Sequence, residues 1–185
     1  GPEAGIALSN NIISHTSVNR DQEHLPQVLY SFPEYIPDRT DFITGKISEN
    51  PGFRIAELLM KMESLDVCLA GMACNSAHAP RIFNVITSEL QKYKSGIRLF
   101  HMIEEIGKFM QEYYPGIKNI GVLGTTGTYI SRQYDLLNNY DLEIINISEE
   151  EQKKLHKAIY DPVYGIKSNA GKIHEDSREI LEESM

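Results

Sequence analysis

Cys74 is the residue of this sequence on which a chemical reaction would most plausibly depend, because of the segments on either side of it. Residues 67–72 form a short apolar run, which predicts a buried strand of an α/β sheet. Helical periodicity begins after Pro80. A thiol between the carboxyl end of a strand and the amino end of a helix lies near unpaired N–H groups and the helix dipole, and both favour the reactive thiolate. From its position alone, Cys74 could also be a small buried apolar residue.

Three loops carry residues that could bind an anion. Arg39 follows Pro37 in an extended loop, and its guanidinium could hold a carboxylate through two hydrogen bonds. The sequence Gly-Thr-Thr-Gly-Thr at 124–128 offers N–H groups and hydroxyls that suit a carboxylate or a phosphate, although it matches neither nucleotide-binding pattern. Lys167 lies in the third loop. Without further context, the arginine and lysine could be solvated surface residues, and the glycines could serve only a turn.

Helices and strands alternate along the chain, which predicts an α/β fold. The expected helices cover residues 1–13, 52–65, 80–93, 101–113, 149–160 and 173–185, and the expected strands cover 28–32, 67–72, 97–100, 117–123 and 140–145. The pattern starts again after the turn at 114–116. We therefore expect two similar Rossmann-like (flavodoxin-like) α/β domains, residues 1–102 and 103–185, which face a central cleft.

The bulk composition limits the possible partners. A net charge of −8 argues against a nucleic-acid partner, which needs a basic face. The sequence has no apolar run of the roughly 20 residues that a membrane span needs, and its first residues lack the basic-then-apolar pattern of a leader, so we expect no membrane partner. Cys68 and Cys74 lie six residues apart within or beside one expected strand, a geometry that disfavours a disulfide, so we expect a reducing, cytoplasmic location and a core position for Cys68. The six histidines show no metal spacing, so we expect no zinc site.

The sequence Cys-Asn-Ser-Ala-His at 74–78 resembles the first catalytic-cysteine motif of the aspartate/glutamate racemase family, usually Cys-Asn-Thr-Ala-His. Four other segments agree with that family in the same order: residues 1–4, 36–40, 121–128 and 165–168. The matches extend over nearly the whole chain and are closest to the aspartate racemase branch. We therefore expect an enzyme that interconverts L- and D-aspartate, or L- and D-glutamate.

The resemblance also implies which residues would be catalytic and which would bind the substrate. The family uses two cysteines, and neither pyridoxal phosphate nor a metal, so Cys74 would be one catalytic residue and no cofactor is expected. Arg39 and Lys167 would select a substrate with an acidic side chain. A group of small polar residues and one glycine would bind the amino acid's backbone groups: Asn75, Ser76, Thr126, Gly127 and Thr128. The partner would be a small molecule, with no nucleic acid or membrane, and a homodimer is possible.

Two departures from the family pattern leave alternatives open. In the family, a strand and a glycine-rich turn precede the segment at 1–4, and the second cysteine lies in a Gly-Cys-Thr-Glu segment beyond the point where this chain ends. We expect that both ends of the chain are incomplete; alternatively, the protein works with one base. A related isomerase or decarboxylase would keep Cys74 for another reaction. A binding protein for acidic amino acids, or a degenerate racemase, would keep the carboxylate contacts without turnover.

Overall fold

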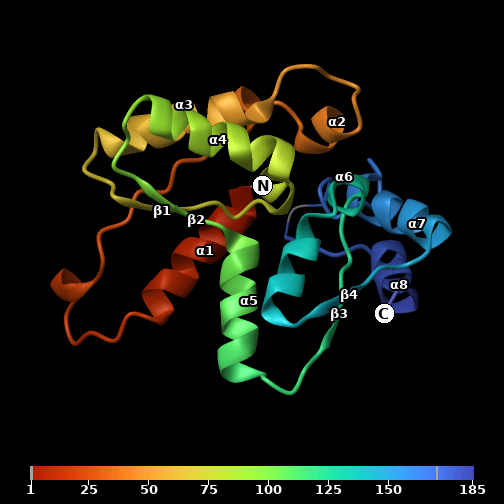
Figure 1. Cartoon of the computed structure of the whole chain (residues 1–185). Helices are drawn as coiled ribbons and strands as arrows, with labels where there is room; N and C mark the ends of the chain where they lie inside the picture. Colours follow the sequence, from red (N-terminus) through yellow and green to blue (C-terminus); the bar gives the residue numbers. More distant parts are fainter. Residues whose placement is uncertain (1, 170) are drawn as a thin grey trace.

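The computed structural model describes residues 2–169 and 171–185 and alternates helices with short strands (Figure 1). The α-helices are α1 (Pro2–Ser14), α2 (Arg39–Ile43), α3 (Pro51–Glu63), α4 (Pro80–Lys92), α5 (Met102–Tyr113), α6 (Thr126–Ser131), α7 (Glu149–Tyr160) and α8 (Glu175–Glu183). The 3₁₀ helices are η1 (Asp21–Glu23), η2 (Pro33–Tyr35), η3 (Asn75–His78) and η4 (Gln133–Tyr140). The strands are β1 (Leu69–Gly71), β2 (Arg98–Phe100), β3 (Asn119–Gly121) and β4 (Glu143–Ile145).

The strands form two separate parallel pairs. β1 pairs with β2, with Leu69 opposite Arg98, and β3 pairs with β4, with Asn119 opposite Glu143. Parallel neighbours need a crossover connection. α4 supplies it for the first pair, α6 and η4 supply it for the second, and α5 leads from one pair to the other (Figure 1). The protein is therefore an α/β protein with parallel strands, as the sequence predicts.

The first hydrophobic core lies between α3, α4 and β1. Apolar side chains repeat at helical spacing on both helices, so each helix buries one face. The buried members include Ile55, Ala56 and Leu59 of α3, Ile82, Ile86 and Leu90 of α4, and Ala70 of β1. The two helices approach closely at Gly52, where a Cβ atom would lie 2.8 Å from the Ile82 carbonyl oxygen. This core supports the end of β1, from which the chain continues to Cys74.

The second core joins α5 to η4. Ile103 of α5 and Leu137 of η4 are fully buried, and Leu142 completes the cluster. Gly107 lies where α5 meets the Tyr140 ring, and a Cβ atom there would lie 2.5 Å from Tyr140 Cγ. This packing fixes the position of η4, whose first residue contacts the Cys74 segment described below.

Two expectations about the strands are wrong. Residues 28–32 form extended coil rather than a strand; the described residues provide no strand beside them, and Leu29 is 51% exposed. Cys68 is exposed rather than part of the core. β1 buries only its central residue, Ala70, and leaves Leu69 58% exposed, because one face of the two-stranded sheet lies open. A continuous apolar run therefore marked the strand correctly but not its environment.

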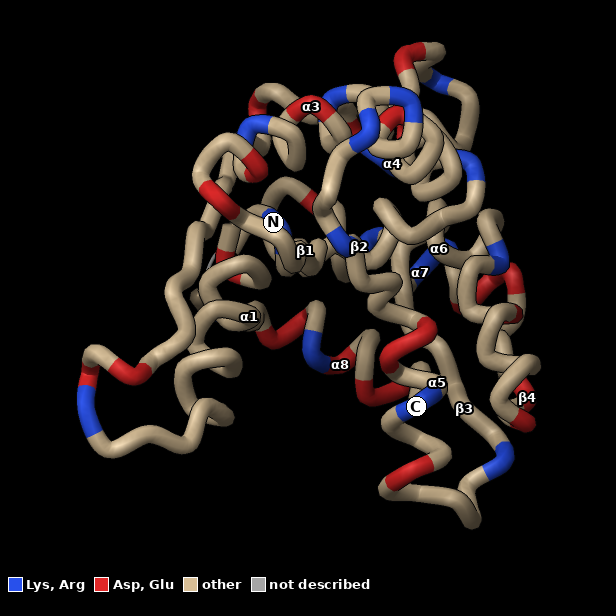
Figure 2. Tube along the Cα trace, turned by 60° about the vertical axis from the view of Figure 1, so that its left-hand side comes forward, with Lys and Arg blue, Asp and Glu red and all other residues tan. Residues whose placement is uncertain are grey.

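Charged residues of both signs are interspersed along the trace, and the residues drawn there form no continuous basic stretch (Figure 2). The ion pairs are largely solvent-exposed and mostly local, such as that between Lys46 and Asp41 at 3.0 Å. Pairs of this kind contribute about 0–1 kcal/mol each to stability, so the cores dominate. Within the described residues, no helix is both long enough and apolar enough to span a membrane.

We predict that Gly107→Ala destabilises the protein by about 1–3 kcal/mol, because the new methyl group would overlap the Tyr140 ring. Helix propensity alone would favour alanine by about 1 kcal/mol, so the sign of the change separates the two effects. Urea unfolding measures it. Gly116→Ala is the matched control, because a Cβ atom there meets no other atom within 4 Å. Increased stability of Gly107→Ala would contradict the described packing of α5 on η4.

Candidate active site

Cys74 occupies a turn between β1 and α4. It is half-buried, has an extended backbone, and immediately precedes η3. The helix expected after Pro80 is present as α4, and the 3₁₀ helix η3 lies between Cys74 and its start. Cys74 therefore depends on the contacts of its own turn for its position. Two side chains, His78 and Gln133, hold the backbone of that turn.

His78 holds the Cys74 carbonyl from the inner side. Its Nδ1 donates to the Cys74 oxygen at 2.9 Å, because a carbonyl can only accept. The ring is 1% exposed, stacks on Phe83, and meets the edge of the His101 ring at a centroid distance of 4.9 Å. Burial is the main cause that lowers the pKa of His78, and the nearby His101 lowers it further. The neutral form is thus favoured, and among the described residues its Nε2 has no partner.

Gln133 holds Asn75, the next residue of the turn. Its Nε2 lies 2.7 Å from both the backbone oxygen and the side-chain oxygen of Asn75. Tyr134 also meets the Asn75 side chain; burial raises the pKa of its phenol, and the hydrogen bond to Asn75 opposes that rise. Sequence analysis missed Gln133, since a single glutamine in a helical stretch carries no chemical signal.

Arg39 begins α2 and lies beside the acid that caps this helix. The carboxylate of Asp38 accepts hydrogen bonds from the N–H groups of Thr40 and Asp41 at 2.8 and 3.0 Å. Burial raises the pKa of Asp38, but the N–H of Asp41 and the charges of Lys167 and Arg39 outweigh it, so the pKa lies below its usual value. Arg39 Nη1 donates to the Pro37 oxygen at 3.3 Å. Its Nε is buried and has no hydrogen-bond partner within residues 2–169 and 171–185.

The loop at 124–128 packs directly on α2. A Cβ atom on Gly127 would lie 2.9 Å from Thr40 Oγ1 and 3.1 Å from Thr40 Cα, so glycine permits the approach. The hydroxyls of Thr40 and Thr125 are 3.4 Å apart. Gly127 and Thr128 are buried in these contacts, whereas Thr126 is only half-buried. Of the three loop residues predicted to bind substrate, Thr126 is thus the most accessible.

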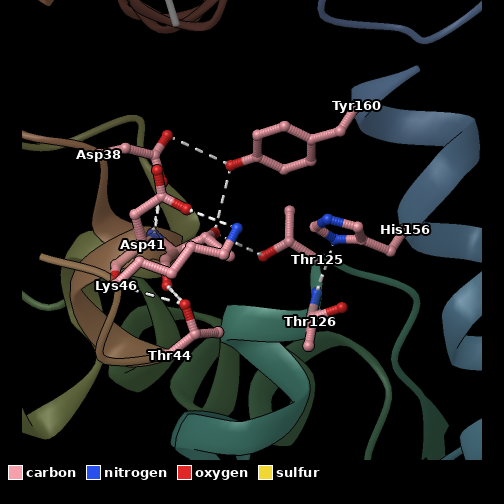
Figure 3. A network of polar contacts seen from close by, with 9 residues as sticks. Asp38, Asp41, Thr44, Lys46, Thr125, Thr126, His156 and Tyr160 are labelled. Atoms are coloured by element: carbon pink, nitrogen blue, oxygen red, sulfur yellow. Dashed lines mark hydrogen bonds and ion pairs between the residues drawn. The ribbon is translucent and has the colours of Figure 1, made fainter.

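Tyr160, at the end of α7, joins the loops (Figure 3). Its hydroxyl lies 3.3 Å from Asp38 Oδ2 and 3.2 Å from Thr40 Oγ1. The Nζ of Lys167 lies 3.7 Å from the centre of the Tyr160 ring. His156, one helical turn earlier, stacks on the same ring and accepts a hydrogen bond from the Thr126 N–H. Sequence analysis missed both aromatic residues, although their spacing of four places them on one face of α7.

The structure thus gathers the expected residues into two connected groups. Arg39, the loop at 124–128 and Lys167 meet around Thr40 and Tyr160. Cys74, Asn75 and Ser76 form the second group, which Gln133 ties to the segment after α6. η3 contacts both α2 and α6, so the groups adjoin. The part of the chain that the structure describes contains no cluster of three or more residues suited to hold a metal ion.

Comparisons with known proteins identify the family of the chain. The family model described as Asp/Glu/hydantoin racemase matches residues 1–184, so the chain belongs to this racemase family. The solved structure of an aspartate racemase from Picrophilus torridus is similar, with a TM-score of 0.75 and 26% sequence identity. The alignment covers 100% of this chain and 70% of that chain. The resemblance drawn from the motifs is confirmed, and membership of the family implies an amino-acid isomerase with a small substrate.

We predict that His78 makes stability depend on pH. Its pKa is lowered in the folded state, so below the unfolded value of about 6.5 the unfolded chain binds more protons. The contribution of His78 to the unfolding free energy is therefore fully present above that pH and is lost as the pH falls. His78→Asn keeps a donor and removes the titration, so we expect a shallower loss of unfolding free energy between about pH 7 and 5.

Urea unfolding at a series of pH values measures this slope. His15→Gln is the matched control because His15 is exposed in the turn directly after α1. Carboxylates such as Asp38, whose pKa is also lowered, change the unfolding free energy only in a more acidic range, below about pH 4. An equal slope for wild type and His78→Asn would contradict the burial of a neutral His78.

Proposed function

We propose that this protein is a cofactor-independent racemase that interconverts L- and D-aspartate, with glutamate as the other possible substrate. The observation that carries the proposal is the buried Nε of Arg39, which lacks a partner among the described residues. A buried guanidinium nitrogen is costly to leave unpaired, and a carboxylate supplies the acceptor that it needs. Family membership and the similarity to the Picrophilus torridus aspartate racemase support the same substrate class.

In the proposed reaction, the Cys74 thiolate takes the α-proton and becomes a thiol. The electron pair left on the α-carbon is delocalised onto the substrate carboxylate, which hydrogen bonds stabilise. A second acid returns a proton to the opposite face of the carbon and becomes the base for the reverse direction. No net redox change occurs, and no atom is lost from the substrate.

The binding residues divide between the two ends of the substrate. We assign Asn75, Ser76 and Thr126 to its backbone groups, with Gly127 and Thr128 forming the loop that presents Thr126. Arg39 and Lys167 bind the side-chain carboxylate. Asp38 stays ionised because its pKa is lowered, and its charge together with the Tyr160 ring holds Lys167 near the site in the absence of substrate.

We propose further that residues 1–102 and 103–185 are two similar domains that face a central cleft. Each contributes one parallel pair of strands, β1 with β2 and β3 with β4. Cys74 would approach the substrate from the first domain, and the loop at 124–128 from the second. Both cysteines are free thiols, which supports a reducing, cytoplasmic location.

A binding protein for acidic amino acids, without turnover, is the second candidate. It is favoured by one observation: the sequence contains only two cysteines, and the other one, Cys68, lies exposed directly before β1. A racemase of the proposed type needs an acid on each face of the α-carbon. The experiment below separates the two candidates because binding alone exchanges no α-proton.

We predict that aspartate incubated with the protein in D2O loses its α-proton signal from both enantiomers, with inversion. Proton NMR follows the loss, and chiral chromatography follows the inversion. Cys74→Ala should abolish both, whereas Cys68→Ala is the matched control and should retain them. Exchange from one enantiomer with retention would show a single base. If neither aspartate nor glutamate exchanges, although calorimetry detects their binding, the racemase proposal fails and the binding protein is favoured.

We predict that Arg39→Lys raises the KM for aspartate by about 10- to 100-fold, since the loss of a charge-assisted hydrogen bond costs about 1.5–3 kcal/mol. The substitution keeps the positive charge at position 39, so a change in KM reports the hydrogen-bond geometry of the guanidinium. The rate of thiol-dependent exchange at saturating substrate should change less. Arg178→Lys is the matched control because Arg178 is exposed on α8. An unchanged KM would remove Arg39 from the proposed substrate site.

A further inference from the structure

We infer that Gln133 is a positioning residue that fixes the orientation of the Asn75 side-chain amide and thereby aims an N–H group of Asn75 at the substrate. The inference rests on the proposed function, because it takes Asn75 as a substrate contact. Gln133 lies outside every motif that the sequence shares with the racemases. We infer its role from which atoms donate and which accept hydrogen bonds in the turn that carries Cys74.

The orientation of Gln133 follows from its partners. The backbone oxygen of Asn75 can only accept, so the atom of Gln133 that lies 2.7 Å from it must be the nitrogen. The other side of the amide agrees, because the Ser131 hydroxyl donates to Gln133 Oε1 at 3.0 Å. Gln133 is 3% exposed, so water cannot readily replace these partners. The glutamine amide is therefore locked in one orientation.

The orientation of Asn75 follows from that of Gln133. The second hydrogen on Gln133 Nε2 points to the Asn75 side chain at 2.7 Å, so the atom there must be the oxygen, Oδ1. The amide nitrogen of Asn75 consequently faces away from Gln133. Rotation of the Asn75 amide by half a turn would place two nitrogen donors against each other. Such a contact is unfavourable in a buried site, so the nitrogen stays on the side away from Gln133.

The Asn75 nitrogen then has two hydrogens to offer. The Tyr134 phenol, whose raised pKa the Asn75 side chain opposes, can take one of them at most, so at least one remains for a substrate acceptor beside Cys74, the adjacent residue of the turn. Gln133 thus uses its own two hydrogens on one residue, fixing both its backbone and its side chain. A purely structural anchor would need only the backbone contact.

The test compares Gln133→Met with wild type. Methionine has a similar length and cannot hydrogen-bond strongly, so the Asn75 amide would be free to rotate. We expect the KM for aspartate in the exchange assay to rise about 10-fold with a smaller change in kcat. Gln133→Glu is the second variant, because it keeps the shape of the side chain and places a carboxylate against the two oxygens of Asn75. We expect Gln133→Glu to raise the KM for aspartate at least as much as Gln133→Met does.

A double-mutant cycle with Asn75→Ala separates positioning of the amide from support of the turn. If Gln133 acts through the amide, Gln133→Met should have little further effect on KM once the Asn75 side chain is gone. An equal rise in both backgrounds would overturn the inference, as would an unchanged KM in the single variants. Urea unfolding checks that each variant is folded.

A second readout does not depend on turnover. The side-chain ¹⁵N–¹H signals of Asn75 are assigned by their loss in Asn75→Ala, and they should shift and gain mobility in Gln133→Met. Unchanged signals overturn the inference even if the enzyme is active. Absence of exchange in the wild-type protein, together with shifted Asn75 signals, would instead reject the proposed function and leave the orienting contact established.

Discussion

The close approach of Gly127 to Thr40 is the contact on which the arrangement of the site depends. The backbone of the loop at 124–128 lies directly against α2, and the gap accommodates no side chain. Because Arg39 is the neighbour of Thr40 and Thr126 is the neighbour of Gly127, this one contact brings together residues about 85 positions apart in the sequence. Tyr160 then adds the C-terminal part of the chain by its hydrogen bonds to Asp38 and Thr40.

The polar groups around this contact divide into those with partners and those without. His78 holds the carbonyl of Cys74 and Gln133 holds that of Asn75, so the turn that carries the thiol is constrained at two successive residues. Arg39 Nε is buried without a partner in the described chain. His78 Nε2 is a second such atom. Buried polar atoms in folded proteins are normally paired, and Arg39 Nε is the one to which our proposal assigns an external group.

Sequence patterns predicted the helices well and the environments of the strands poorly. Helical periodicity located α4 and α7 nearly to the residue, because a helix satisfies its own backbone and needs only one apolar face. A strand depends on neighbours far away in the chain. Residues 28–32 have the composition of a strand but no partner in the described structure, and the apolar run beside Cys68 leaves that residue exposed. Motif residues were likewise identifiable, whereas Gln133, His156 and Tyr160 act through contacts that only the folded chain creates.

The Lys167 ammonium group lies over the Tyr160 ring, so the ring competes with any ligand for contact with this charge. Moving the Lys167 ammonium group off an aromatic face 3.7 Å away loses a favourable cation–π interaction. Contact with the incoming group must supply at least that much free energy. A second carboxylate on the ligand can do so, because it offers a full negative charge. An uncharged side chain cannot, and the ammonium then stays on the ring. In the proposed site, the aromatic face would thus favour dicarboxylates over amino acids with neutral side chains without touching the ligand itself.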